Sequence, residues 1–360
     1  MSNRIYNFSA GPSMLPLPVL EKVQAGLLNY DNTGMSVMEM SHRSKPYEAI
    51  NAEVEALLRE LMGIPSDYAV IFIQGGASTQ FEAIPLNLSK NKTADYVVTG
   101  IFSEKAYKEA KKFTDAKEIA SSKDKSFSYI PALKKSDFNT KADYAHICYN
   151  NTIVGTRFTS VPDTGSVPLV ADMSSMILSE VVPVEKFGVI YAGAQKNLAP
   201  AGVTIVIVKK ELAESPADIC PTMLKWKTQI EQNSLYNTPP SFSTYVALEV
   251  LRWLKAFGGV KAMQKFNEDK AKLLYDFIDN SKFYSNTVAK KDRSIMNVPF
   301  VSPNADLDDK FVKEASQKGL VSLKGHRLVG GMRASIYNAM PLDGIKDLIG
   351  FMKSFESENK

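Results

Sequence analysis

The chain has 360 residues, of which 44% are apolar and 23% are charged, and its formal net charge is +4. That length is too great for one small core and suits two lobes, and the composition is that of a folded protein rather than a disordered one. The small net charge gives no reason to expect nucleic acid or an anionic membrane as a partner. Lysines and acids alternate over 105–125, which is typical of a solvated face.

Cysteine usage and the N-terminus predict a cytoplasmic protein. The two cysteines, Cys148 and Cys220, are far apart and form no metal-ligand pattern, so no metal is expected. Residues 1–12 have neither the basic start nor the apolar block of a secretory signal. No stretch approaches about eighteen uninterrupted apolar residues, so no membrane span is predicted.

The first part of the chain predicts two helices and then a buried strand that leads into a third helix. A short helix is expected over 17–28. Apolar residues recur at a spacing of three to four over 46–62, which predicts a helix ended by Gly63. The all-apolar run 69–73 is typical of a buried strand, and a helical pattern follows over 80–88.

Strand and helix patterns alternate after this point. Further strands are predicted at 96–99, 144–149, 169–171, 189–191 and 203–208. Alternation of this kind indicates an α/β fold with a largely parallel sheet and helices on both faces. Gly258 and Gly259 close an apolar helix over 244–257, and we place a boundary there.

The residues beyond this boundary predict a smaller α+β unit. Its expected elements are helices near 260–280 and 308–318 and strands near 294–301 and 332–337. We therefore predict a large domain over 16–258 and a small domain made of 1–15 and 259–360.

Lys196 is the residue with the most evident chemistry. It follows the predicted strand 189–191 in a segment of small residues, which would let a planar ligand approach the backbone closely. An amine in such a place can form a Schiff base with an aldehyde cofactor, of which pyridoxal phosphate is the usual one. The alternative is a surface lysine in a loop of glycines and alanines.

Two further features suit such a cofactor. Residues 75–79, Gly-Gly-Ala-Ser-Thr, join a strand to a helix, where backbone N–H groups bind phosphate well; an ordinary turn is the alternative. They match neither a P-loop nor the dinucleotide fingerprint. Asp172 ends a predicted strand, where a carboxylate can keep a pyridine nitrogen protonated; a helix N-cap is the alternative.

Two pairs of histidine and arginine predict an anion site. His42 precedes Arg43, and His326 precedes Arg327, with Arg333 shortly after the second pair. Guanidinium groups bind carboxylates and phosphates through paired hydrogen bonds, as a doubly acidic substrate would require. The alternative is a set of surface arginines.

Six motifs in order resemble one family. They are Asn7-Phe8-Ser9-Ala10-Gly11-Pro12, Met40-Ser41-His42-Arg43-Ser44, Gln74-Gly75-Gly76-Ala77, Gly193-Ala194-Gln195-Lys196-Asn197, Tyr236-Asn237-Thr238-Pro239-Pro240, and the segment from Gly325-His326-Arg327 to Gly330-Gly331-Met332-Arg333-Ala334-Ser335. Across essentially the whole chain the sequence resembles the phosphoserine aminotransferase family of class V aminotransferases. The resemblance implies a pyridoxal-phosphate-dependent transferase of fold type I, with a mostly parallel seven-stranded sheet and a smaller α+β domain.

The resemblance also implies roles for individual residues. Lys196 would carry the Schiff base and Asp172 would pair with the pyridine nitrogen. The other cofactor contacts it implies are Thr152 and Phe102 at the ring, and Gly76, Ala77, Ser78 and Gln195 at the phosphate, joined by Asn237 and Thr238 of the other subunit. The substrate contacts it implies are Ser9, Arg43 and Arg333, with His42, His326 and Arg327 placed to bind the phosphate or second carboxylate.

Two positions depart from the commonest form of the family. Phe102 stands where many members carry Trp; it can still stack on the pyridine, with a smaller face and no indole N–H. Ser78 stands where some members carry Arg. The guanidinium lost there leaves more of the substrate phosphate to histidines and arginines elsewhere.

The activity implied is reversible amino transfer between L-glutamate and 3-phosphohydroxypyruvate in L-serine biosynthesis, by a homodimer with shared active sites. Some members also act in pyridoxine biosynthesis. Lys196 would serve as general base and acid. The rivals are a cysteine desulfurase or serine–glyoxylate transaminase of the same fold, and a cofactor-binding regulator without turnover. The absence of cysteine after Cys220 argues against a desulfurase, and the set of Lys196, Asp172 and arginines argues against a regulator.

Overall fold

The computed structural model describes residues 4–327 and 329–359, so residues 1–3, 328 and 360 of the predicted small domain lie outside the described part. Its centre is a seven-stranded sheet of order β2-β10-β9-β8-β5-β3-β4. The strands are β2 Tyr68–Ile73, β3 Thr93–Val98, β4 Asp115–Ser121, β5 Tyr144–Cys148, β8 Leu169–Asp172, β9 Val189–Gly193 and β10 Thr204–Lys209. β10 runs antiparallel to both of its neighbours and the other pairs are parallel, so the expected α/β fold with a mostly parallel seven-stranded sheet is confirmed.

The central strands form because both of their faces are covered. Every residue of β5, β8 and β9 is buried, which explains their almost uninterrupted apolar sequences. β4 lies at one edge of the sheet and is only partly buried, with exposed charged residues such as Lys117 and Glu118. The charged stretch 105–125 that suggested a solvated face therefore contains this edge strand and the second half of helix α4 Ile101–Ala110.

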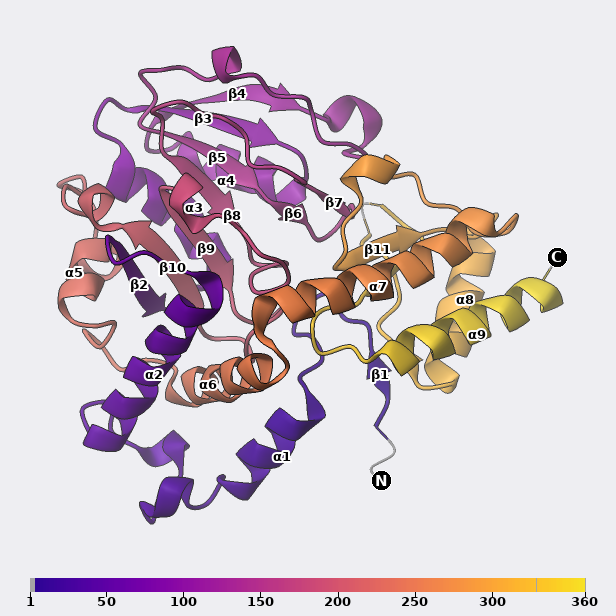
Figure 1. The fold of residues 1–360 in the computed structure, drawn as a ribbon. Coiled ribbons are helices and arrows are strands. Elements are labelled where there is room, and N and C mark those ends of the chain that lie inside the picture. Colours follow the sequence, from indigo (N-terminus) through magenta and orange to yellow (C-terminus); the bar gives the residue numbers. More distant parts are fainter. Residues whose placement is uncertain (1–3, 328, 360) are drawn as a thin grey trace.

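Helices cover both faces of the sheet (Figure 1). One core joins α1 Leu17–Ala25, α2 Lys45–Met62, α6 Ser241–Ala256 and α7 Gly259–Asn280 to one face. A second core joins α3 Gly76–Leu88, α4 and the short α5 Trp226–Glu231 to the other face. The sheet is thereby sandwiched, and its strand ends are left to form sites.

Two helices near the N-terminus differ from their expected bounds. α1 ends at Ala25 rather than near 28, because Gly26 follows it and the last backbone bonds close there. α3 begins at Gly76, four residues before its expected start. Gly75 and Gly76 have φ values of 95° and 70°, which let the chain turn directly from β2 into the helix.

The C-terminal part, drawn in orange to yellow in Figure 1, contains α7, α8 and α9 and two small sheets, one of which includes the N-terminal β1, drawn in indigo. β1 Tyr6–Asn7 pairs in parallel with β12 Leu320–Val321, and β11 Asn297–Phe300 pairs antiparallel with β13 Met332–Ser335. α8 spans Ala305–Gln317, and α9 spans Leu342–Glu358. The sequence analysis assigned no helix after residue 337; α9 forms there because its buried Ile345, Leu348, Met352 and Phe355 recur at helical spacing.

A hairpin of β6 Asn150–Asn151 and β7 Thr156–Arg157 lies between the main sheet and β11 (Figure 1). Its turn approaches β11 closely: a Cβ on Gly155 would come within 2.3 Å of Pro299 Cδ, and Gly155 has a φ of 76°. Only glycine fits both conditions. The hairpin therefore places Thr152, within its turn, between the main sheet and the C-terminal strands.

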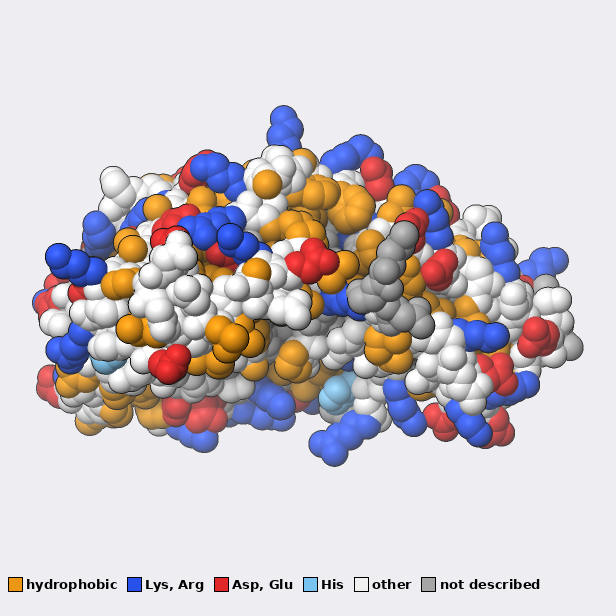
Figure 2. All heavy atoms as spheres, turned by 90° about the horizontal axis from the view of Figure 1, so that it is seen from below, with side chains coloured by type: hydrophobic (Ala, Val, Ile, Leu, Met, Phe, Trp, Pro, Cys, Tyr) orange, Lys and Arg blue, Asp and Glu red, His pale blue; other side chains and the backbone are white. Residues whose placement is uncertain are grey.

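The surface is mixed in charge. Figure 2 shows Lys and Arg side chains intermingled with Asp and Glu on the face seen from below. None of the described helices has the length and apolar character needed to cross a membrane. Both cysteines are buried free thiols.

Candidate active site

Lys196 lies in the turn that follows β9, at the carboxyl edge of the parallel strands. Its Nζ donates to Thr152 Oγ1 at 2.6 Å and lies 5.1 Å from the centre of the Phe102 ring. Burial lowers the pKa of Lys196 to about 8 and Arg333 adds to the shift, while Asp172 and Cys148 oppose it. An amine with such a pKa is partly neutral near neutral pH, and the neutral form is the nucleophile toward an aldehyde.

The N-terminal arm holds the lysine turn in place. Ser13 N donates to Gln195 O at 3.0 Å, and the Ser13 hydroxyl bonds to the carbonyl of Lys196. A Cβ on Gly11 would come within 3.3 Å of Lys196 Cγ. Ser9 belongs to the same arm, where its hydroxyl accepts from Gly11 N at 3.3 Å. The structure thus brings Ser9 into the arm that covers Lys196.

Asp172 ends β8 at the same edge of the sheet and is 5% exposed. One of its carboxylate oxygens, Oδ1, accepts from Ser174 N at 2.9 Å. Burial raises the pKa of Asp172, whereas the hydrogen bonds from Ser174, the charge of Lys196 and the Tyr191 hydroxyl lower it. A cationic ring nitrogen would compensate the burial of this carboxylate.

The start of α3 is suited to phosphate. The helix has 13 residues and no side chain caps its N-terminus, so its first N–H groups are free to bind an anion. Gly76, Ala77 and Ser78 form this first turn. Gln195 lies over the end of β9, because a Cβ on Gly193 would come within 2.6 Å of Gln195 Oε1.

Asn237 and Thr238 lie beside the same helix start within one chain. Gln74 Nε2 donates to the carbonyl of Thr238 at 2.8 Å, and Asn237 lines a cavity together with Gly75. Tyr236, next in sequence, is 44% exposed. Their expected contact with the cofactor phosphate of a second subunit stays a prediction.

Arg333 extends from β13 toward the lysine. Its Nη1 donates to the carbonyl of Thr152 at 3.4 Å, and burial lowers its pKa. Its Nε is buried and has no hydrogen-bond partner in the described part of the chain. Thr152 therefore contacts Lys196 through its side chain and Arg333 through its backbone.

His326 lies in a group of positive charges. Burial lowers the pKa of His326, and the charges of Arg333, Arg327 and Lys105 lower it further. Arg327 is exposed and His326 is partly exposed. These four cationic or potentially cationic side chains could bind an anion, and the anion site expected from the histidine–arginine pair stays a prediction.

Lys105 was missed in the sequence analysis, which grouped it with solvated lysines. Its Nζ lies 5.7 Å from the centre of the Phe102 ring, on the same helix α4. The signal available was its spacing, since residues three apart on a helix lie on one face. The spacing of Phe102 and Lys105 therefore predicts that the lysine lies near the same site as the ring.

His42 and Arg43 are not brought to this group. They lie just before α2, where Ser44 Oγ donates to Ser41 O at 2.7 Å and Arg43 N donates to Ser41 Oγ at 3.3 Å. Arg43 is exposed. Within the described residues of one chain, no hydrogen bond or ion pair joins either side chain to Lys196, Thr152 or Arg333.

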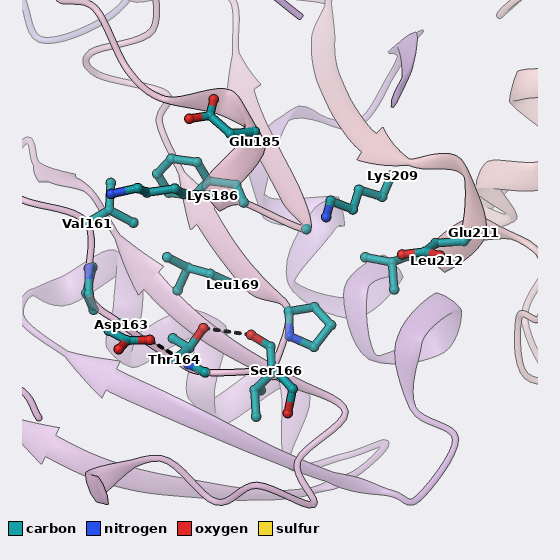
Figure 3. Close-up of a pocket in the computed structure, with 16 residues that line it drawn as sticks. Val161, Asp163, Thr164, Ser166, Leu169, Glu185, Lys186, Lys209, Glu211 and Leu212 are labelled. Atoms are coloured by element: carbon teal, nitrogen blue, oxygen red, sulfur yellow. Dashed lines mark hydrogen bonds between the residues drawn. The ribbon is translucent and has the colours of Figure 1, made fainter. Parts of the chain in front are cut away.

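A cavity of about 550 Å³ lies at the amino ends of the central strands, opposite to the ends that carry Asp172 and Lys196 (Figure 3). It is bounded by Leu169, the first residue of β8, whereas Asp172 is the last. Lys186, Lys209 and Glu185 add charges of both signs to its wall. The predicted site residues do not line it, so its size does not make it the active site.

These features fit pyridoxal phosphate. A lysine of lowered pKa faces an aromatic ring and a threonine hydroxyl, a buried carboxylate ends the neighbouring strand, and an uncapped helix start can bind a phosphate. An orphaned guanidinium nitrogen nearby suits the carboxylate of a substrate.

Comparison with known proteins agrees with this chemistry. The family described as Aminotransferase class-V matches residues 5–348. The chain is 56% identical to the phosphoserine aminotransferase of Bacillus thuringiensis subsp. konkukian, covering 99% of each chain, and 55% identical to that of Bacillus anthracis, covering 100% of each. The chain belongs to the phosphoserine aminotransferases of the class V family.

Solved structures support the assignment at the level of the fold. The phosphoserine aminotransferase from Bacillus circulans subsp. alkalophilus superposes with a TM-score of 0.97 at 49% identity, covering all of both chains. A pyridoxal-phosphate-bound phosphoserine aminotransferase from Trichomonas vaginalis gives 0.93 at 39% identity, covering 97% of this chain and 100% of that one. The expected family, enzyme class and cofactor are thereby confirmed.

Proposed function

We propose that this enzyme moves the amino group of L-glutamate reversibly to 3-phosphohydroxypyruvate, giving 2-oxoglutarate and O-phospho-L-serine. The observation that carries this proposal is the position of Thr152, whose hydroxyl accepts from the Lys196 amine while its carbonyl accepts from Arg333. The amine of Lys196 and the guanidinium of Arg333 thus both contact Thr152, and the guanidinium can bind a carboxylate. Amino acids and keto acids both carry the carboxylate that such a pair would hold beside the reacting carbon.

Lys196 would hold the cofactor through its aldehyde, and its amine would accept and return the proton of the substrate α-carbon. When bound, pyridoxal phosphate supplies an electron sink for the electron pair left on that carbon. Asp172 holds the proton on the ring nitrogen, and Thr152 orients the amine. A pKa of about 8 lets Lys196 both accept and return a proton near neutral pH.

The cationic group selects the distal end of each substrate. Glutamate carries a second carboxylate there, and phosphohydroxypyruvate carries a phosphate. We assign this end to His326, Arg327 and Lys105, because the charges of Arg327 and Lys105 act on His326, whose pKa is lowered first by burial and then by its cationic neighbours. Arg333 takes the carboxylate next to the reacting carbon.

We also propose a homodimer with shared active sites. Asn237 and Thr238 would reach the cofactor phosphate of a second subunit, and the exposed Arg43 with His42 would complete the substrate site of that subunit. Exposed apolar side chains near these segments support an interface, among them Met38, 57% exposed, and Tyr236. Within each chain, we place residues 1–15 and 259–360 in one small domain. The pairing of the N-terminal β1 with β12 supports this division.

The test is to run the two halves of the reaction separately. L-Glutamate is added to the cofactor-loaded enzyme, and absorbance follows conversion of the cofactor to its aminated form. 3-Phosphohydroxypyruvate is then added and should restore the original spectrum. A spectrum that glutamate leaves unchanged would contradict the proposal and favour a cofactor-binding regulator.

A further inference from the structure

Two buried polar side chains, Tyr191 and His146, lie beside Asp172 on neighbouring strands of the main sheet. Tyr191 of β9 is directly opposite Asp172 of β8 in the parallel register, so the two side chains lie on the same face of the sheet, and the Tyr191 hydroxyl lowers the pKa of the carboxyl. His146 of β5 places Nε2 at 2.9 Å from the same hydroxyl. His146 and Tyr191 have no exposed surface, so this polar line runs through an otherwise apolar core.

The direction of these hydrogen bonds follows from their end members. An ionised Asp172 can only accept, so a hydrogen bond between these two neighbours would run from the Tyr191 O–H to the carboxylate. The Tyr191 oxygen then accepts from His146, which must carry its proton on Nε2. The other ring nitrogen, Nδ1, becomes an acceptor, and it is buried without a hydrogen-bond partner in the described residues. Each proton in the line therefore points toward Asp172.

Neighbouring rings hold this line in position. His146 stacks on Tyr96, with ring centres 4.9 Å apart and planes inclined by 22°. Tyr191 packs edge-on against Phe81 of α3, with ring centres 6.4 Å apart. Burial lowers the pKa of His146 to about 3, so the imidazole stays neutral. A neutral histidine can donate a hydrogen bond to Tyr191 without adding a positive charge. Such a charge would compete with the ring nitrogen of the cofactor for Asp172.

We propose that Tyr191 and His146 are positioning residues that keep Asp172 ionised and aimed at the ring nitrogen of the cofactor. The inference rests on the proposed function of Asp172. A buried carboxylate that lost the Tyr191 hydroxyl would be less stable as an anion and freer to turn. Cofactor binding and the chemical step should then suffer, whereas substrate affinity, which depends on Arg333 and the cationic group, should not.

The test compares Tyr191→Phe with Tyr144→Phe. Tyr144 is equally buried in the same core and its hydroxyl bonds to Tyr96 at 2.8 Å, but it is not opposite Asp172 in the register and is not among the groups that shift the pKa of Asp172. We expect Tyr191→Phe to raise the dissociation constant of pyridoxal phosphate for the apoenzyme, and to lower kcat, each by about tenfold or more. KM for glutamate should change by less than about twofold. Tyr144→Phe should lower thermal stability only.

The dependence on Asp172 is tested in a double-mutant cycle. In an Asp172→Asn background, Tyr191→Phe should weaken cofactor binding no further, since the charge that it supports is gone. An equal effect in both backgrounds, or a Tyr191→Phe variant indistinguishable from Tyr144→Phe, would overturn the proposal. Because cofactor binding is measured on the apoenzyme, this outcome is distinct from a failure of glutamate to react with the wild type, which would refute the proposed function.

His146→Phe supplies a second variant should Tyr191→Phe not fold. It leaves the Tyr191 hydroxyl on Asp172 and removes only the donor behind it. Cofactor affinity should fall, but by a smaller factor than the effect expected for Tyr191→Phe. Unchanged affinity in His146→Phe would exclude His146 from the positioning line.

Discussion

The lowered pKa of Lys196 has a consequence that can be measured in the apoenzyme. At a pKa of about 8, about a tenth of the amine is neutral at pH 7 and about nine tenths at pH 9. Only the neutral amine attacks an aldehyde, so the rate of cofactor capture by apoenzyme should rise across this range and level off above it. Stopped-flow absorbance after mixing with pyridoxal phosphate measures this rate.

Lys196→Ala is the control for that experiment. Cofactor should still bind, through the proposed contacts at the start of α3 and at Asp172, but the rise in capture rate centred near pH 8 should vanish. Turnover should fall by at least roughly 10²–10⁴-fold, the usual loss when a general acid–base group is removed. Near-normal transamination by the purified variant would show that another residue does this work.

Lys105 should contribute to the choice of substrate. We expect the wild type to prefer phosphorylated over plain hydroxypyruvate by at least about tenfold, because charge-assisted contacts hold the phosphate. Lys105→Met should reduce this preference by up to about fivefold, a small factor because Lys105 is exposed. The measurement is kcat/KM on the two keto acids.

Lys108→Met is the matched control on the same helix. Its Nζ pairs with Glu104 at 3.1 Å, and it is exposed as Lys105 is, but it is not among the charges that act on His326. The preference should survive this change. Equal effects of the two substitutions would mean that only the general positive charge of α4 matters.

The sequence identified residues whose type and neighbours reveal their chemistry, but not those whose role depends on strand order. Lys196 stood among small residues and Asp172 at a strand end, so both could be singled out. Tyr191 and His146 look like ordinary buried strand residues. They meet only because β5, β8 and β9 are neighbours in that order, and no local pattern specifies which parallel strands lie side by side.

At the scale of elements, the start of α3 depends on two glycines that should differ in their tolerance. Both have positive φ, so alanine at either costs about 1–2 kcal/mol of folding free energy. Nothing lies within 4 Å of a Cβ on Gly76, but a Cβ on Gly75 would come within 2.2 Å of Thr79 Oγ1. Gly75→Ala should therefore lower the free energy of unfolding more than Gly76→Ala, as urea denaturation of the apoenzymes would measure.

The same pair tests the phosphate site. Thr79 Oγ1 donates to Gly75 O at 2.8 Å, so displacing Thr79 would disturb the first turn that is to hold the phosphate. Gly75→Ala should thus also bind pyridoxal phosphate more weakly than Gly76→Ala. If both variants bound the cofactor as the wild type does, the phosphate would be held elsewhere.

Element prediction succeeded where burial dictates the pattern and failed where it does not. The all-apolar β2 and the amphipathic α2 were expected close to their observed bounds. β4 was not identified because an edge strand is exposed and carries charges that resemble a solvated surface. The start of α3 was placed too late because its first turn contains glycines and Ser78, which usually indicate a loop.

At the scale of the whole molecule, buried amides link the lysine turn to the C-terminal part. Asn338 N donates to Asn197 Oδ1 at 3.0 Å, and Asn267 Nδ2 donates to Asn338 Oδ1 at 2.8 Å. Lys270 donates to the carbonyls of Ile336 and Tyr337 at 2.9 and 2.8 Å, just after β13. These contacts fix the strand that carries Arg333 relative to the turn that carries Lys196. The two side chains therefore keep their relative positions within each chain.

Shared active sites would extend this arrangement across two chains, which subunit mixing can test. One chain carries Lys196→Ala, and the other carries Asn237→Tyr and Thr238→Tyr. Each should be inactive alone, because the first lacks the amine and the second blocks the phosphate contact of its partner. A mixed dimer contains one site with both sets of residues intact and one with both damaged.

Refolding the two chains together should therefore restore activity. Random pairing makes about half of the dimers mixed, each with one working site of two, so recovery should reach about a quarter of the wild-type rate. Sedimentation must show dimers, and differently tagged chains must show that mixed ones form. If mixed dimers form and remain inactive, or if the active species is a monomer, Asn237 and Thr238 serve the phosphate site of their own chain, beside Gln74, where Thr238 already accepts a hydrogen bond.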